Sequence, residues 1–212
     1  SIDNIKNTQK ISLKVLSEKM NFDLSNKKYI VLLKHPLSSE KDESGINMRK
    51  TLKAINNFCY KYNYKVVGIY PNTDPGSYDI LDAINEYKKT SHFQFYKNLP
   101  HIEFVNLMRN ASALIGNSSM GILEAPFYKL PVVNVGKRQT GRLNAGNVEF
   151  VNFQEEDIIR ALKKACLNKN YKNFIKNIKN PYGTGTAANK IANVVEKIDF
   201  SNRKWYIKKG LA

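Results

Sequence analysis

Short apolar runs alternate with longer amphipathic segments along this chain of 212 residues. The clearest run covers residues 29–33, where apolar residues follow one another without a polar residue between them. A run of strand length without alternation is typical of a strand that is covered on both faces, as in a parallel sheet. Residues 44–62 instead repeat their apolar positions at the spacing of an amphipathic helix. The pattern therefore predicts a chain in which strands and helices alternate.

The alternation of apolar runs and amphipathic segments continues along the rest of the sequence. The expected strands are 29–33, 64–70, 93–96, 112–116, 131–135 and 148–151. The expected helices are 2–20, 44–62, 78–89, 101–109, 120–128, 155–168 and 187–198. Such alternation is what βαβ crossovers produce. We therefore expect one α/β domain over residues 1–212, a doubly wound and mostly parallel Rossmann-like sheet with helices on both faces.

The composition narrows the class of protein. Hydrophobic residues make up 42% and charged residues 25%, which excludes collagen-like, coiled-coil and wholly disordered chains. No apolar stretch approaches the roughly 20 residues that a membrane span needs, and the first ten residues lack the apolar core of a secretion signal. Cys59 and Cys166 are too few and too far apart for a disulfide framework or a four-cysteine zinc site. We expect a cytoplasmic protein without a metal ion and without membrane contact.

The net charge of +16, from 34 basic and 18 acidic residues, raises the question of nucleic-acid binding. However, arginine, the residue type that reads bases and clamps phosphates with two hydrogen bonds, is scarce. The abundant lysines are scattered among asparagines along the helical segments, as on a solvated surface. The sequence therefore predicts no nucleic-acid partner.

Candidate chemistry lies in the turns that follow the strands. Ligands of doubly wound sheets bind at the carboxyl ends of the strands. The unusual turns there are 34–36, 71–77, 116–121 and 136–142, which carry polar side chains, prolines and glycines. All four are expected to open on the same edge of the sheet.

The turn at 116–121 is suited to a phosphate. Ser118 and Ser119 supply hydroxyls before a helix, and Gly121 allows the close approach of a ligand to the backbone. Glu124 follows in the same helix, where its carboxylate suits the two hydroxyls of a ribose. Simpler interpretations are a serine that only caps the helix and a glutamate that only favours it.

The other turns offer similar pairs of interpretations. His35 ends a strand ahead of a proline, and it is able to carry charge to a phosphate or to exchange protons near neutral pH. Arg138 and Arg142 lie in a glycine-flanked loop that can reach over a diphosphate or a sugar. Asp74 and Ser77 follow the second strand. The simpler alternatives are a structural histidine, solvated arginines and a tight turn.

Taken in order, these turns resemble the C-terminal half of the hydrolysing UDP-N-acetylglucosamine 2-epimerases of the sialic-acid pathway. The matching stretches are 33–36, 70–77, 115–121 with Glu124, and 131–142. The resemblance covers nearly the whole chain and implies one half of a GT-B-like enzyme that needs no cofactor. Its reaction is the elimination of UDP followed by hydration, which releases N-acetylmannosamine or a close relative. The N-terminal domain that supplies the carboxylates for proton abstraction is absent here, so the chain alone is expected to be inactive.

The resemblance also implies roles for particular residues. His35 would lie beside the diphosphate and the reacting sugar as a catalytic residue, and backbone near 95–98 would read the uracil. The implied UDP-binding residues are Asn72, Asp74, Ser77, Asn98, Ser118, Ser119, Gly121, Glu124, Arg138 and Arg142. The implied partners are UDP, a UDP-N-acetylhexosamine, the absent N-terminal domain and, for the complete enzyme, further copies in a homo-oligomer. Two alternatives are the donor-binding half of a GT-B UDP-sugar glycosyltransferase and a basic, non-catalytic interaction module.

Overall fold

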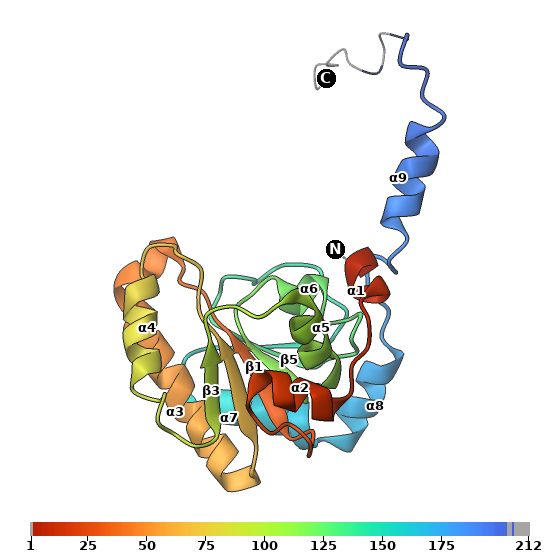
Figure 1. Cartoon of the computed structure of the whole chain (residues 1–212). Helices are drawn as coiled ribbons and strands as arrows, with labels where there is room; N and C mark the ends of the chain where they lie inside the picture. The colour runs from red at the N-terminus through yellow and green to blue at the C-terminus, as the bar shows by residue number, and fades with distance from the viewer. Residues whose placement is uncertain (1, 203–204, 206–212) are drawn as a thin grey trace.

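The centre of the fold is a strand, β1 (Tyr29–Leu33), whose side chains are all buried. The computed structural model describes residues 2–202 and Trp205. The other strands in this part of the chain are β2 (Lys65–Ile69), β3 (Phe93–Tyr96), β4 (Ala113–Gly116), β5 (Val132–Val135) and β6 (Val148–Val151). They pair in parallel in the order β3–β2–β1–β4–β5–β6 (Figure 1). The expected strands and the parallel Rossmann-like sheet are confirmed.

Helices cover both faces of this sheet, which explains why β1 is apolar throughout (Figure 1). Ile30 and Leu32 pack into one core with helices α3 (Ser44–Tyr62), α4 (Ser77–Asn85) and α7 (Glu155–Leu167). Val31 and Leu33 point the other way, into a core with α2 (Leu13–Met20) and α5 (His101–Asn110). Successive residues of a strand face opposite sides, so a strand between two helical layers needs apolar residues at every position.

The remaining helical segments are shorter or more peripheral. They are α1 (Ile2–Asn7), the 3-10 segment η1 (Ser38–Glu43), α6 (Met120–Leu123), α8 (Lys169–Asn177) and α9 (Ala187–Val195). Helix α9 has no buried residue and extends away from the sheet (Figure 1). None of the helices within residues 2–202 is long and apolar enough to cross a membrane. The domain expected over 1–212 includes residues 1, 203–204 and 206–212, which lie outside the described part.

The helical pattern expected over residues 2–20 is divided between two separate helices, α1 and α2. The end of α1 and the residue after it are held by Arg109 of α5, whose guanidinium donates to the carbonyls of Ile5 (2.7 Å) and Thr8 (3.0 Å). Ser12 then starts α2 by accepting a hydrogen bond from the Val15 amide at 3.3 Å. A long-range contact thus outweighs a locally helical pattern.

The C-terminal half also differs from the expectation in two places. The helix expected over 120–128 stops at Leu123, because Pro126 has no N–H to continue the ladder. Helix α8 was not expected, since its sequence contains few apolar residues. It forms nonetheless because Asn168 caps it, accepting from the Tyr171 amide at 2.9 Å, and because Ile175 is buried.

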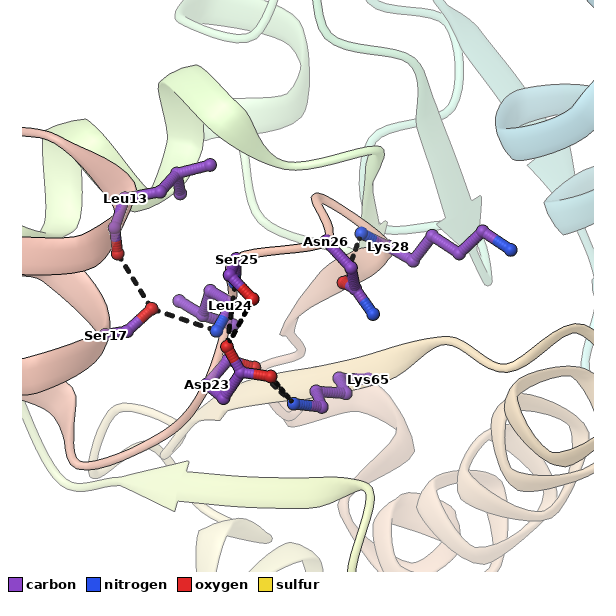
Figure 2. A network of polar contacts seen from close by, with 8 residues as sticks. All are labelled: Leu13, Ser17, Asp23, Leu24, Ser25, Asn26, Lys28 and Lys65. Atoms are coloured by element: carbon purple, nitrogen blue, oxygen red, sulfur yellow. Dashed lines mark hydrogen bonds and ion pairs between the residues drawn. The ribbon is translucent and has the colours of Figure 1, made fainter.

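The opposite edge of the sheet, where the strands begin, is fixed by a polar network (Figure 2). Ser17 donates to the Leu13 carbonyl at 2.7 Å and accepts from the Leu24 amide at 3.0 Å, which ties α2 to the loop before β1. Asp23 pairs with Lys65 at the start of β2, 2.8 Å apart. The Lys65 ammonium holds the pKa of the Asp23 carboxyl well below its usual range. This network stabilises the scaffold on the side away from the strand ends.

Candidate functional site

The carboxyl ends of β1 and β4 meet at the point where the strand order reverses, and Asn117 joins them there. Its side chain accepts from the His35 amide at 2.7 Å and donates to the His35 carbonyl at 2.8 Å. Its own amide donates to the Leu33 carbonyl at 3.2 Å. Such a crevice is where doubly wound sheets bind their ligands. Asn117 therefore fixes the backbone of His35 at the expected ligand edge.

The turn after β5 is tied to the same residue. Arg138 Nη1 and Gln139 Nε2 donate to the Asn117 carbonyl at 3.2 and 3.0 Å. Gln139 is buried, while Arg138 is half-buried. Three turns that are far apart in the sequence thus converge on Asn117, and the expectation that they open on one edge is confirmed for them.

The turn after β2 orients the ring of His35. The Asn72 amide donates to His35 Nδ1 at 3.1 Å, and the Asn72 side chain donates to Asp74. Because Nδ1 accepts a hydrogen bond, the proton of the neutral ring lies on Nε2. Burial and the nearby charge of Arg138 lower the pKa of His35, although the Asp74 carboxylate opposes the shift. Near pH 7 the ring is therefore neutral, with Nε2–H as a donor.

The two serines after β4 are half-buried beside this cluster. Ser118 Oγ accepts from the Met120 amide at 3.4 Å, whereas Ser119 makes no side-chain cap. The simple N-cap interpretation thus fails for the Ser119 hydroxyl, which is not engaged in capping α6. Because α6 ends at Leu123, its dipole adds little, and any anion here is held by hydroxyls and amides of the turn.

Glu124 lies at the end of α6, beside an open pocket of about 460 Å³. The pocket is also lined by Tyr182 and by the glycine-rich segment 183–186. Burial raises the pKa of the Glu124 carboxyl. Among the residues that the structure describes, none forms a hydrogen bond or ion pair with this carboxylate. A half-buried acceptor without donors is costly unless a ligand supplies them.

Besides the two serines and Glu124, four predicted site residues form no side-chain hydrogen bond with the cluster around Asn117 in the part of the chain that the structure describes. Ser77 is buried at the start of α4. The Asn98 side chain accepts from the amide of the next residue at 2.9 Å, and Arg142 is exposed. Gly121 packs against β5, where an added Cβ would lie 2.8 Å from Val132 Cγ1. The packing of α6 on β5 is sufficient to explain this glycine, and the contact of these residues with UDP stays a prediction.

Sequence reasoning left three residues out of the proposed site. Asn117 and Gln139 are buried polar residues within turns that were singled out, and Lys34 precedes His35. Lys34 is only 4% exposed. A polar residue directly after a buried strand was the available signal for Asn117 and Lys34. Their burial depends on packing between distant turns, which local patterns do not reveal.

The sequence profile of the family described as "UDP-N-acetylglucosamine 2-epimerase" matches residues 1–196. The chain belongs to the UDP-N-acetylglucosamine 2-epimerase family. The match covers β1 to β6 and every residue of the cluster around Asn117. The resemblance inferred from the turns is thereby confirmed.

Two curated relatives have names that specify the hydrolysing reaction. The UDP-N,N'-diacetylbacillosamine 2-epimerase (hydrolyzing) of Legionella pneumophila is 34% identical over 155 residues, which is 73% of this chain and 40% of the relative. The GDP/UDP-N,N'-diacetylbacillosamine 2-epimerase (hydrolyzing) of Campylobacter jejuni is 33% identical over 166 residues, 76% of this chain and 41% of the relative. The chain thus spans less than half the length of these relatives.

Solved structures of the family share the fold. The UDP-GlcNAc 2-epimerase of Neisseria meningitidis, solved with UDP-GlcNAc bound, superposes with a TM-score of 0.70 at 22% identity. The superposition covers 87% of this chain and 49% of that one. The epimerase-family chain described here therefore has the Rossmann-like architecture of one half of a GT-B fold.

Proposed function

We propose that this chain is the UDP-binding half of a hydrolysing UDP-sugar 2-epimerase. The sugar is N-acetylglucosamine or a diacetamido-trideoxy analogue, the kind of sugar in the names of the two curated relatives. The observation that carries the proposal is the Glu124 carboxylate, which borders an open pocket and has no hydrogen-bond or ion-pair partner within residues 2–202, in a chain whose family match covers this residue and the strand-end cluster. The glycosyltransferase alternative explains the fold but not this family match.

In this proposal the residues at the strand ends hold the leaving group. Ser118 and Ser119 bind the diphosphate, Glu124 accepts from the ribose hydroxyls, and His35 donates Nε2–H to a diphosphate oxygen. The bond from sugar C1 to UDP breaks while a base of the N-terminal domain removes the proton from C2. Water then adds to the resulting double bond. The part of the reaction that this chain supports is the stabilisation of negative charge on departing UDP.

Replacing Glu124 by alanine is expected to weaken UDP binding about ten- to a hundredfold while leaving the fold intact. A carboxylate that accepts from two hydroxyls makes charge-assisted hydrogen bonds worth roughly 1.5–3 kcal/mol. Isothermal titration calorimetry with UDP measures the loss. Glu156→Ala, which removes an exposed glutamate from α7, is the matched control and should bind UDP like the wild type.

The ribose contact is tested with 2′-deoxyuridine diphosphate. Wild-type protein should prefer the ribose form, and Glu124→Ala should lose most of that preference, because both changes remove the same contact. Equal discrimination by the two proteins would mean that Glu124 does not bind the ribose.

The chain alone is expected to bind UDP weakly and not to release UDP from UDP-N-acetylglucosamine. It retains the residues proposed for the nucleotide, but domain closure and the catalytic base come from the other half of the enzyme. A coupled assay for UDP release, run without any acceptor, measures turnover. Steady release by the purified chain would refute the half-enzyme proposal. Release by the complete protein without an acceptor would exclude the glycosyltransferase alternative.

A further inference from the structure

A small cavity lies beneath the strand-end cluster, on the side of α3, and a buried lysine faces it. The cavity has a volume of about 10 Å³, and Lys34, His35, Asn117 and Phe153 are among its lining residues. That volume holds about one water molecule. The Lys34 ammonium lies 5.3 Å from the centre of the Phe153 ring. The lysine thus points into the interior of the protein rather than into solvent.

The polar neighbours of Lys34 are already engaged with other groups. Ser44 donates to the Glu40 carbonyl and Asn47 to the Glu43 carboxylate, both at 3.3 Å. The carboxylate of Glu40, on η1, pairs with Lys137 at 2.6 Å. Within residues 2–202, no acceptor forms a hydrogen bond or ion pair with the Lys34 ammonium. The face of the Phe153 ring and the nearby charge of Glu40 compensate its burial only in part, because a buried cation normally also has a hydrogen-bonded partner.

The charged side chains that line the cavity are mostly cations. The charged side chains that line it are Lys34 after β1, Glu40 on η1, and Lys137 and Arg138 after β5, which makes three cations for one carboxylate. His35 is neutral near pH 7, and α3 contributes the uncharged Ser44 and Asn47. Burial lowers the pKa of Lys34 to about 8, while the Glu40 carboxylate opposes the shift. Two further carboxylates lie nearby, Glu43 by Lys137 and Asp74 by His35. Within residues 2–202, neither Lys34 nor Arg138 forms an ion pair with a carboxylate, and an anion at the strand ends would supply the missing counter-charge.

We propose that Lys34 is a buried cation that stabilises the diphosphate of bound UDP from beneath the cluster formed by His35, Asn117 and Arg138. This role rests on the proposed UDP binding. A charge buried in the protein is screened far less than one on the surface. The Lys34 ammonium therefore acts on the diphosphate either across a distance, without direct contact, or through one bridging water. UDP binding should then favour the protonated lysine, and the complex should take up a proton as it forms.

The test is the pH dependence of UDP affinity, measured by isothermal titration calorimetry in two buffers of different ionisation enthalpy. The charged lysine predominates below its pKa, so affinity is highest there and falls as the pH rises. For a pKa near 8 that rises by about two units in the complex, the wild-type affinity should fall about tenfold between pH 7 and pH 9. About half a proton should be taken up near pH 8. Uridine, which lacks the diphosphate, is the control for effects of pH on binding of the nucleoside part. Its affinity should not depend on Lys34.

Two variants separate this role from a structural one. Lys34→Met should bind UDP at least about tenfold more weakly at pH 7, with little further loss up to pH 9, and its melting temperature should be equal or higher because a buried charge is removed. Lys41→Met, which removes an exposed lysine from η1, should behave like the wild type. If Lys34→Met binds UDP at pH 7 as tightly as the wild type, or if both proteins show the same pH dependence, the role of Lys34 is overturned while the proposed function stands. Absence of UDP binding to the wild type would overturn the proposed function and this inference together.

Discussion

Replacing Gly116 by alanine is expected to lower the free energy of unfolding by roughly 4 kcal/mol or more, one of the largest effects of a single methyl group in this chain. Gly116 ends β4 with φ +141°, a conformation that residues with a side chain rarely adopt. An added Cβ would lie 2.0 Å from the Leu33 carbonyl oxygen of β1. That neighbour is backbone in the central strand pair and cannot rotate away, so β1 and β4 would have to separate where Asn117 joins them.

Urea unfolding followed by circular dichroism measures this loss. Gly141→Ala is the matched control, since Gly141 has φ +82° but no atom within 4 Å of an added Cβ. This variant should lose only the conformational strain, about 1–2 kcal/mol. The difference between the two variants reports the clash between β1 and β4. Similar losses in both would mean that strain alone, and not the close approach of the strands, requires glycine at position 116.

Replacing His35 by alanine in the complete two-domain protein is expected to reduce turnover about a hundred- to a thousandfold, while UDP binding weakens only a few-fold. In the proposed reaction Nε2–H meets the charge that develops on departing UDP, so its loss affects the transition state more than the ground state. Steady-state kinetics combined with UDP titration separates the two effects. Turnover near the wild-type value, with a lower melting temperature as the only change, would make His35 a structural residue.

The pH profile gives a second measure of the role of His35. In the proposed reaction the neutral ring is the active form, and burial together with Arg138 lowers the pKa of His35. Activity should therefore persist below pH 6.5, the usual pKa of a histidine, and decline only in more acidic solution. His92, a half-buried histidine before β3 at the opposite edge of the sheet, provides the control, and His92→Ala should leave kcat unchanged.

The sequence alone predicted much of the fold because its strongest signals are local. The unbroken apolar run at 29–33 specifies a strand covered on both faces, and all of its side chains are buried. Turn residues directly after the strands indicated which edge carries chemistry, and their order along the chain indicated the family. Besides helix α8, which was missed because its sequence contains few apolar residues, the errors lie where a distant contact or a single proline outweighs the local pattern. Arg109 holds the break between α1 and α2, and Pro126 ends α6 early.

Only the tertiary structure decided how the turns meet. The pairing of His35 with Asn117 joins residues 82 positions apart, and Arg138 reaches the same asparagine from a third turn. Lys34 illustrates the difference, since in the sequence it is one lysine among many, whereas packing against Phe153 removes it from solvent. Residue types and their spacing determine which elements form. The burial, charge balance and pKa of a side chain depend on groups that only the folded sheet brings together.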